Sequence, residues 1–246
     1  MVMEVMAARN LDYRYRPDSP PVLCDINLQL QRGELAVVSG LSGCGKSTLC
    51  LCLCGAIRHQ RDGIMSGEVE LNGKNIRDIR GAELALEVGI VFQDPDTQLF
   101  SPTVEDEIAF APENLCLPPE HIQERLDYVL EILGITALRY ANPAHLSGGE
   151  KQLVALAAVL ALDPPLLILD EVMSQLDAAA KKAVADAIYK LHSQGKTVLA
   201  VEHDLEVLTG ADRLLIMESG HLIRGDKPEV ILADRDFLLV HQLLDN

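Results

Sequence analysis

The chain has 246 residues and a formal net charge of −16 at pH 7; 48% of its residues are hydrophobic, only 4% are aromatic and tryptophan is absent. These values allow a sizeable, mainly aliphatic core, and the acidity argues against a nucleic-acid-binding surface, which needs a basic footprint. The sequence has no run of roughly 18 or more apolar residues, so we expect no transmembrane helix.

The N-terminal segment "MVMEVMAARNLDYRY" lacks a basic head followed by an apolar stretch. We therefore expect no secretory signal and a cytosolic protein. In that compartment the six cysteines are expected to be reduced thiols rather than disulfides.

Short apolar runs alternate with stretches of helical periodicity along the chain. Apolar runs bounded by polar residues are typical of buried parallel strands. We expect such strands at 34–40, 87–93, 165–171, 196–203 and 213–219. Strands that alternate with helices predict an α/β fold with its sites at the carboxyl ends of the strands.

Two helices are predicted between the second and third of these strands. In the stretch 120–134, one face carries Ile122, Leu126, Val129 and Leu133, and the stretch 148–162 forms the other helix. Proline-rich segments predict loops. These loops are expected at 17–21 and 112–120.

The order of these predicted strands and helices indicates an α/β core with a helical insertion. The ranges 1–95 and 159–225 are expected to form the α/β core, 96–158 the helical subdomain, and 226–246 a short helical tail. The range 96–158 is interpreted as a helical insertion because its strand signals are weak and it contains the two predicted helices.

The stretch "GLSGCGKST" matches the phosphate-loop pattern G-x-x-x-x-G-K-[ST] and lies between a predicted strand and a helical run. Its glycines allow backbone N–H groups to close around phosphates, and the following helix N-terminus adds its dipole. We expect Lys46 to reach the β- and γ-phosphates and the Ser47 hydroxyl to bind Mg²⁺. The residues expected at the nucleotide are Gly40, Ser42, Gly43, Cys44, Gly45, Lys46, Ser47 and Thr48.

Four of the six cysteines lie in the phosphate loop and the helical run that follows it, at positions 44, 50, 52 and 54. On a helix Cys50 and Cys54 share a face and Cys52 points nearly opposite, so the three thiols do not converge on one metal. Leucines fill the gaps between them, which predicts a helix that is apolar all round and buried, with cysteine acting as a small hydrophobe. Cys44 lies beside Lys46 and a helix N-terminus, so we expect it to be exposed, reactive and protected by ATP from alkylation.

Acidic and neutral polar residues follow several predicted strands. In "LLILDE" the carboxylate of Asp170 must emerge at the strand end, where a phosphate-loop NTPase needs a carboxylate for Mg²⁺. Glu171 is placed to orient and deprotonate the attacking water. His203 ends "TVLAVEH" as a γ-phosphate sensor or as an ordinary surface histidine. Gln93 ends "GIVFQ" as a contact to Mg²⁺ or to the attacking water, or as a plain polar strand end.

A second glycine-rich turn, "LSGGEKQ", opens the helix at 148–162. Ser147 and Glu150 have the spacing of a capping box, while Gly148 and Gly149 leave bare amides at a positive helix end that can bind an anion. A capping box alone does not explain two glycines, which weaken a first helical turn. This half site has no lysine or metal ligand, so its natural completion is the phosphate loop of a second chain.

The motif "LSGGE" resembles the signature motif of ABC-type ATPases, and its place after the phosphate loop and Gln93 and before "LLILDE" is also that of this family. The resemblance covers nearly the whole chain. It implies a RecA-like P-loop NTPase core with an inserted helical subdomain, ATP hydrolysis, and a head-to-tail dimer that holds two ATP between phosphate loop and signature. It also implies that Tyr15 stacks on adenine, with Tyr13 as its rival, that Asp177 crosses the dimer interface, and that His203 is the switch histidine.

The segments "FQDPDTQLFSPTVEDEIAFAPENLCLP" and "AAVLALDP" are similar to the ATPases of energy-coupling-factor transporters, which import vitamins or cobalt and nickel ions. This resemblance implies ATP and Mg²⁺ as cofactors and a second ABC ATPase subunit, identical or paralogous, as partner. It further implies a transmembrane coupling subunit, a substrate-binding membrane subunit, and a location on the cytoplasmic face of the cell membrane. The transported substrate is set by the other subunits.

The chain departs from the family pattern without losing a catalytic group. Val172 and Met173 stand where Pro-Thr is usual, Leu153 where Arg is common, and Glu202 where Thr or Ser is common.

Two alternative functions remain open. A soluble ABC ATPase acting on DNA or ribosomes usually carries coiled-coil insertions or two ATPase units, and a P-loop kinase would need an acceptor pocket.

Overall fold

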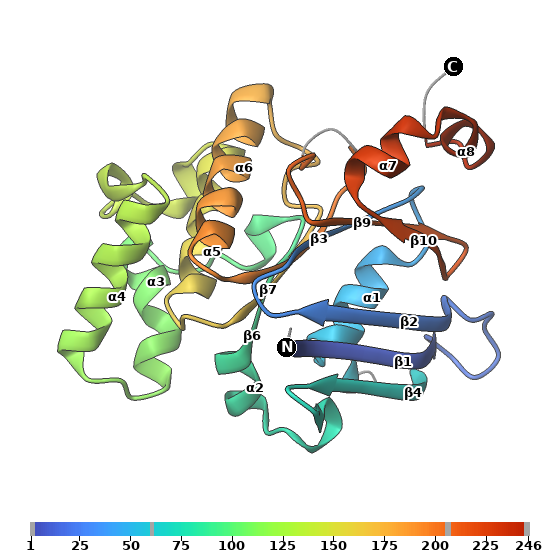
Figure 1. Ribbon diagram of the computed structural model, residues 1–246. Coiled ribbons are helices and arrows are strands. Elements are labelled where there is room, and N and C mark those ends of the chain that lie inside the picture. The colour runs from blue at the N-terminus through green and yellow to red at the C-terminus, as the bar shows by residue number, and fades with distance from the viewer. Residues whose placement is uncertain (1–2, 60–61, 205–207, 244–246) are drawn as a thin grey trace.

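The computed structural model describes residues 3–59, 62–204 and 208–243, and its centre is a six-stranded sheet in the order β10-β9-β3-β8-β7-β6 (Figure 1). The strands other than β10 are parallel, as predicted, and β10 runs antiparallel to β9. Their bounds are β3 (Leu35–Ser39), β6 (Val88–Val91), β7 (Leu166–Asp170), β8 (Thr197–Val201), β9 (Arg213–Glu218) and β10 (His221–Asp226). These bounds confirm the five predicted strands.

A second sheet, which we did not predict, is antiparallel with the order β2-β1-β4-β5. Its strands are β1 (Glu4–Arg14), β2 (Leu23–Gln31), β4 (Ile64–Leu71) and β5 (Lys74–Asn75). In β2 the apolar side chains of Ile26, Leu28 and Leu30 are buried while Asn27 and Gln29 are exposed, which is the period-two pattern of a strand with one solvated face.

Helix α1 (Lys46–Leu53) follows the phosphate loop and lies between the two sheets (Figure 1). Leu49, Cys50, Cys52 and Leu53 of α1 are fully buried in a core cluster that includes residues of both sheets. The apolar sequence of α1 is therefore explained by burial on both sides, as predicted.

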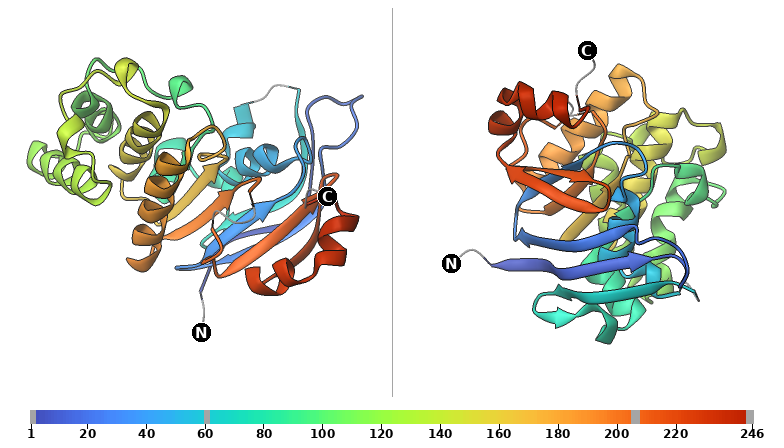
Figure 2. Two further views of the ribbon diagram at one scale, coloured as in Figure 1. Left: turned by 90° about the horizontal axis from the view of Figure 1, so that it is seen from above. Right: turned by 90° about the vertical axis from the view of Figure 1, so that its right-hand side faces the viewer.

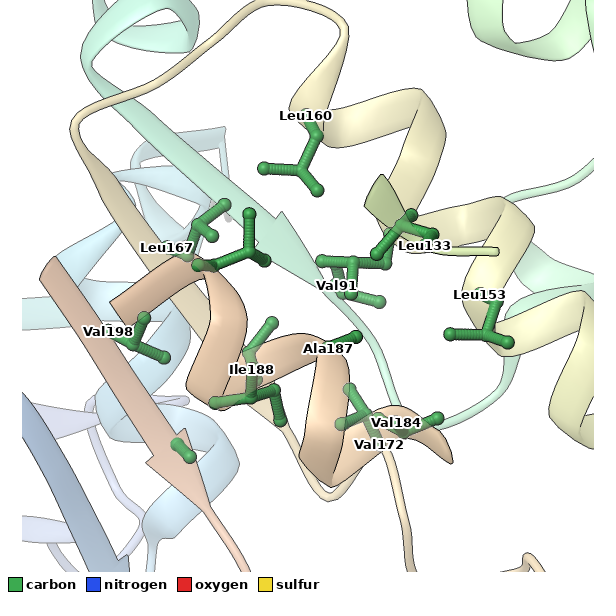
Figure 3. Packing of buried hydrophobic residues seen from close by; sticks show 14 of the residues in the cluster. Val91, Leu133, Leu153, Leu160, Leu167, Val172, Val184, Ala187, Ile188 and Val198 are labelled. Atoms are coloured by element: carbon green, nitrogen blue, oxygen red, sulfur yellow. The ribbon is translucent and has the colours of Figure 1, made fainter. Parts of the chain in front are cut away.

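The opposite face of the six-stranded sheet is covered by α5 (Gly148–Leu160) and α6 (Ala178–Ser193). Figure 3 shows this second cluster, in which Leu167 and Val198 of the sheet pack with Ile188 and Ala187 of α6. The carboxyl ends of the central strands are thus held between two aliphatic layers, which fixes the loops that leave them.

Three α-helices, and not the two that we predicted, lie between β6 and β7: α3 (Val104–Asn114), α4 (Pro119–Ile132) and α5. The predicted loop at 112–120 is wrong at both ends, because Pro112 lies inside α3 and Pro119 begins α4. Pro119 occupies the first helical position, where a missing N–H costs nothing. Helices α3 and α4 lie outside the α/β layers, beyond α5 (Figure 2). The boundary predicted at 158 falls inside α5 and stays a prediction.

The remaining helices are short. They are α2 (Gly81–Glu87), α7 (Pro228–Ala233) and α8 (Arg235–Val240), with 3-10 turns at η1 (Ala56–His59), η2 (Ile76–Asp78), η3 (Pro95–Thr97), η4 (Thr136–Leu138) and η5 (Pro143–His145). Within the described ranges, no helix has the length and apolar character needed to cross a membrane. The predicted loop at 17–21 lies between β1 and β2 and is free of helix and strand.

Candidate active site

The phosphate loop connects β3 to α1 and needs glycine at two close approaches. A Cβ atom on Gly40 would lie 2.0 Å from the carbonyl oxygen of Met217, and one on Gly45 would lie 2.8 Å from that of Val22. Gly45 also has φ +110°, a conformation that L side chains rarely adopt. The glycines therefore allow the loop to fold tightly against β9 and the segment before β2, with its amides at the start of α1.

Lys46 is buried, with only 3% of its surface exposed, and its ammonium group lies at the centre of the site. Its Nζ donates to the carbonyl oxygens of Gly40 at 2.9 Å and Leu41 at 3.1 Å. The same nitrogen lies 3.5 Å from Oε1 of Glu171 and 3.4 Å from Nδ1 of His203. A buried cation is thus held by polar partners in a place that a polyphosphate would fill.

Glu171 follows the last residue of β7 and is 8% exposed. Its Oε1 lies 2.8 Å from Nε2 of His203, and its backbone N–H donates to the carbonyl oxygen of Val201 at 2.9 Å. Glu171 has φ +52°, a left-handed conformation that costs a non-glycine residue energy and that is often found at functional sites. This turn brings the carboxylate of Glu171 and the imidazole of His203 together.

Asp170 is the last residue of β7, as predicted, and is buried. The Ser47 hydroxyl donates to its Oδ1 at 3.0 Å. Burial raises the pKa of Asp170, and the hydrogen bond from Ser47 opposes that rise. A hydroxyl and a carboxylate oxygen beside a phosphate loop are the hard oxygen donors that Mg²⁺ takes together with substrate phosphates, so these two side chains fit a magnesium ion.

A small cavity of about 130 Å³ lies at this position. It is lined by Val22, Gly43, Gly45, Lys46, Ser47, Thr48 and Glu171. Our sequence interpretation missed Val22, an apolar residue directly after the proline-rich loop at 17–21, because nothing local connects it to the phosphate loop.

The two candidate tyrosines differ in exposure. Tyr13 is only 2% exposed, whereas Tyr15 is 37% exposed. The Tyr15 hydroxyl lies 3.0 Å from Oγ1 of Thr48, and the Tyr13 ring packs edge-on against the Tyr15 ring at 5.0 Å. The structure therefore places Tyr15 at the phosphate loop with a ring that a base can reach, and it places Tyr13 in the core.

Gln93 lies two residues beyond the end of β6 and is exposed. Its amide Nε2 donates to Oγ of Ser174 at 3.1 Å, and that hydroxyl donates to the carbonyl oxygen of Glu171 at 2.9 Å. Ser174, which our interpretation missed, thus links Gln93 to the turn that carries Glu171. Only the three-dimensional contact could reveal this link.

The signature turn forms the predicted capping box at the start of α5. The Ser147 side chain accepts the N–H of Glu150, and the Ser147 backbone N–H donates to the Glu150 carboxylate at 2.9 Å. The Ser147 hydroxyl also donates to the Glu150 carboxylate at 2.7 Å, and this bond, together with the one from the Ser147 backbone N–H, lowers the pKa of Glu150. A Cβ atom on Gly149 would lie 2.5 Å from that of Ala180, so packing of α5 against α6 explains one of the two glycines.

Asp177 caps α6, where its carboxylate accepts the N–H of Ala180 at 2.8 Å. Neither Asp177 nor the signature residues Ser147, Gly148, Gly149 and Glu150 belong to the lining of the phosphate-loop cavity. The described part of the chain therefore brings Lys46, Asp170, Glu171 and His203 together and leaves the signature turn apart from them.

The expectation that Cys44 is exposed is wrong, whereas its reactivity and its protection by ATP stay predictions. Its side chain is buried at 8% exposure, and burial raises the pKa of the thiol although Lys46 opposes that rise. Cys50 and Cys52 are fully buried, as predicted, and burial raises their pKa values too, that of Cys52 to about 12. Cys54 is half-buried, and Cys116, between α3 and α4, is exposed.

Comparison with known proteins gives a consistent result. The family model described as ABC transporter matches residues 23–174. The energy-coupling factor transporter ATP-binding protein EcfA of Methanosarcina acetivorans is 43% identical over 226 residues, which are 92% of this chain and 80% of that protein. A putative ABC transporter ATP-binding protein of Pyrococcus abyssi is 39% identical over 238 residues, 96% of this chain and 85% of that protein.

Solved structures show the same likeness. The chain is similar to cbiO1 from Clostridium perfringens, described as part of the ABC transporter complex cbiONQ, with a TM-score of 0.84 and 32% identity over 98% of this chain and 95% of that one. A bacterial Atm1-family ABC exporter with ATP bound has a TM-score of 0.79 at 23% identity, over 98% of this chain and 42% of that one. The exporter supports the fold alone.

Proposed function

Since the chain belongs to the ABC transporter family and is an ATP-binding subunit of the energy-coupling-factor type, we propose that it hydrolyses ATP to drive uptake of a vitamin or a transition-metal ion. The observation that carries the ATPase part of this proposal is the convergence of Lys46, Asp170, Glu171 and His203 at the carboxyl ends of β3, β7 and β8, and the import part rests on the similarity to EcfA and cbiO1. Phosphoryl transfer needs positioning and charge neutralisation, and this set supplies both.

In the proposed mechanism, ATP replaces the carbonyl partners of Lys46. The ammonium group then neutralises the β- and γ-phosphates, and the amides at the start of α1 hold the remaining phosphate oxygens. Ser47 and Asp170 would hold Mg²⁺, which when bound neutralises charge on the phosphates. The ring of Tyr15 would stack on adenine once its hydroxyl leaves Thr48.

Glu171 acts on water in this scheme. Its Oε1 lies 3.5 Å from Nζ of Lys46 and 2.8 Å from Nε2 of His203, which places a carboxylate between the phosphate-binding cation and a second orienting group. From there the carboxylate orients the attacking water and accepts its proton. In this scheme His203 positions the Glu171 carboxylate and contacts the γ-phosphate. Gln93 is connected to the turn that carries Glu171 through its hydrogen bond to Ser174.

The signature turn supplies the other half of the site from a second ABC ATPase subunit, identical or paralogous. Its support is that Ser147 and Gly148 are exposed at the N-terminus of α5, where the cation of the first turn, Lys151, is already paired with Asp96 at 2.7 Å. In the head-to-tail arrangement this end faces the γ-phosphate bound at the partner's phosphate loop, and Asp177 lies at the contact.

A transmembrane coupling subunit and a substrate-binding membrane subunit complete the proposed assembly at the cytoplasmic face of the cell membrane. An apolar groove between β6, α3 and α5, lined by residues such as Leu99, Phe110 and Val159, supports this partner. The rings of Phe100 and Phe110 remain 67% and 45% exposed at its edge, where they pack edge to face at 4.7 Å. An exposed apolar groove of this kind is typical of an interaction site.

Two measurements test the proposed function. Purified protein with Mg²⁺-ATP should release inorganic phosphate, and the Glu171→Gln variant should not. Purification from its own membranes should recover integral membrane subunits, whose identity would also give the transported substrate. Recovery with ribosomes or DNA would contradict the transport function, and transfer of phosphate to an organic acceptor instead of water would contradict the ATPase.

A further inference from the structure

The turn that carries Glu171 is joined to the strand that leads to His203 by a ladder of hydrogen bonds. Strands β7 and β8 are parallel, with Asp170 opposite Val201. Just past the end of β7, the Glu171 N–H donates to the Val201 carbonyl at 2.9 Å. The next contact uses a side chain, since the Met173 N–H donates to Oε1 of Glu202 at 3.2 Å.

This last contact is buried and surrounded by aliphatic side chains. Glu202 is 2% exposed, Met173 is fully buried and Val172 is 3% exposed. Val172 lies in the same buried cluster as Val184 of α6 (Figure 3). A backbone N–H buried here needs an acceptor, because an unsatisfied donor in an apolar site is costly.

Ser39 adds a second buried polar group beside Glu202. The parallel register pairs Val38 of β3 with Val201 of β8, and the Glu202 N–H donates to the Val38 carbonyl at 3.1 Å. Ser39 follows Val38 as Glu202 follows Val201, so alternation places both side chains on the α6 face. Ser39 is 1% exposed, and its hydroxyl has no hydrogen-bond partner in the described part of the chain.

Burial raises the pKa of Glu202 to about 8, although the hydrogen bond from Met173 opposes the rise. Three charged groups act on it from the elements packed around it. Glu171, after β7, and Asp204, on its own segment, disfavour the charged carboxylate, whereas Lys181 of α6 favours it. Lys181 is also drawn to Asp204, whose carboxylate lies 3.7 Å from its Nζ. The raised pKa favours the uncharged form of Glu202 at neutral pH, and in the structure this side chain accepts one backbone hydrogen bond.

We propose that Glu202 is a positioning residue for ATP hydrolysis, whose side chain holds the turn after Glu171 against the strand that leads to His203. The proposal rests on the proposed function. This role gives the buried glutamate next to His203 a function, because its side chain satisfies the buried N–H of Met173. The hydrogen bond between Glu202 and Met173 therefore joins the backbone segment that carries Glu171 to the segment that carries His203.

A pH dependence follows from this arrangement. As the pH rises through about 8, Glu202 becomes charged in a buried site that also holds Glu171. The new charge repels the catalytic carboxylate and draws water into the turn, so kcat should fall on the alkaline side while the affinity for ATP is kept. Because Lys46, Ser47 and the helix amides bind the nucleotide, KM should change little.

The test compares two substitutions at Glu202 with a matched control. Glu202→Gln keeps the shape and the acceptor for Met173 but cannot ionise, so kcat at pH 7 should stay within about twofold of wild type and the alkaline fall should disappear. Glu202→Leu removes the acceptor, and kcat should fall roughly tenfold or more at unchanged ATP affinity. Glu34→Gln is the control, since Glu34 also accepts a backbone N–H, that of Gln31 at 2.7 Å, at the opposite end of the sheet.

Thermal unfolding gives a readout that does not depend on activity. The pKa of Glu202 is raised from its ordinary value of 4.5, so between pH 4.5 and about 8 the unfolded chain releases a proton that the folded chain keeps. The contribution of Glu202 to stability is therefore present at low pH and is lost as the pH rises toward 8. Glu202→Gln should remove this component of the pH dependence of Tm.

The outcomes separate the two proposals. A wild-type protein that hydrolyses no ATP would overturn the proposed function and this inference with it. If the wild-type protein hydrolyses ATP, but Glu202→Gln keeps the same fall of kcat at alkaline pH and Glu202→Leu keeps the wild-type kcat, this inference alone is overturned. Loss of the alkaline fall in Glu202→Gln but not in Glu34→Gln is the result that we expect.

Discussion

Two helices of this chain begin after glycine-rich turns, α1 after the phosphate loop and α5 after the signature turn. At the start of α1 the buried Lys46 supplies a positive charge, and Ser47 is tied to Asp170 on a neighbouring strand. At the start of α5 the exposed Ser147 hydroxyl donates to Glu150, whose pKa is lowered, and the Lys151 ammonium is paired with Asp96 at 2.7 Å. Both ends have the positive helix dipole, yet only the first is built to bind an anion alone.

This difference shows what a helix N-terminus needs in order to bind phosphate. The first end has a cation, oxygen donors for a metal and a carboxylate for water, all from strands that end at the same edge of one sheet. The second end is satisfied by its own capping box and contributes only amides and a hydroxyl. The two ends are therefore complementary halves, which is the basis for proposing that they meet across two subunits.

The largest effect is expected from removing the cation of the first end. Lys46→Ala should lower the affinity for ATP by about 100-fold or more and abolish hydrolysis, because one preorganised charge is worth that much in a dry site. Nucleotide binding by calorimetry and phosphate release measure the two effects. Lys74→Ala, which removes an exposed lysine of β5, is the control and should change neither. Normal ATP affinity in Lys46→Ala would refute the phosphate site.

The next effect separates binding from chemistry at the same end. Glu171→Gln keeps the shape and the contact with His203 but removes the base, so hydrolysis should fall about 100-fold or more while ATP still binds. Light scattering should then show an ATP-bound dimer, and removal of Mg²⁺-ATP should return the single chain. Unchanged hydrolysis would remove Glu171 from its proposed role.

A smaller effect is expected at the second end. Ser147→Ala should lower stability by about 1 kcal/mol through loss of a helix cap and should lower hydrolysis roughly tenfold through loss of a donor to phosphate. Thr103→Ala is a matched control, since Thr103 caps α3 in the same way by accepting the N–H of Asp106 at 3.1 Å. It should lose similar stability and no activity. Equal activity in both variants would make Ser147 a cap and nothing more.

The smallest effect concerns the thiols near the first end. Cys44 is buried with a raised pKa, whereas Cys116 is exposed. An alkylating reagent should therefore modify Cys116 first, at a rate that ATP leaves unchanged, and should reach Cys44 only slowly. Mass spectrometry of the partly labelled native protein gives the order. Labelling of Cys44 before Cys116 would restore the exposed, reactive thiol that the sequence suggested.

Local motifs made most of the first end predictable. The phosphate loop is contiguous, and Asp170 and Glu171 directly follow an apolar strand, so their meeting at one sheet edge follows from topology alone. The capping box of Ser147 and Glu150 is equally local. The alternation in β2 was also present in the sequence, as was the Thr103 cap before α3, but the prolines near α3 favoured a loop.

Contacts between distant segments could not be predicted. Gly149 is required by Ala180 of α6, and Gln93 reaches Ser174. Cys44 is buried because the phosphate loop folds onto β9, where a Cβ atom on Gly40 would lie 2.0 Å from the carbonyl oxygen of Met217. The link between Met173 and Glu202 likewise joins two departures from the family pattern that are separate in the sequence. Each depends on how helices and strands pack, which no local pattern encodes.

In the proposed dimer, an ATP site is completed only when the signature turn of a second subunit meets the phosphate loop. The most direct test is the specific ATPase rate of the purified wild-type protein, measured against protein concentration together with its mass by light scattering. We expect a rate per chain that rises with concentration as dimers form. A substantial rate per chain that stays constant at dilutions where the protein is a single 26.9 kDa chain would contradict it.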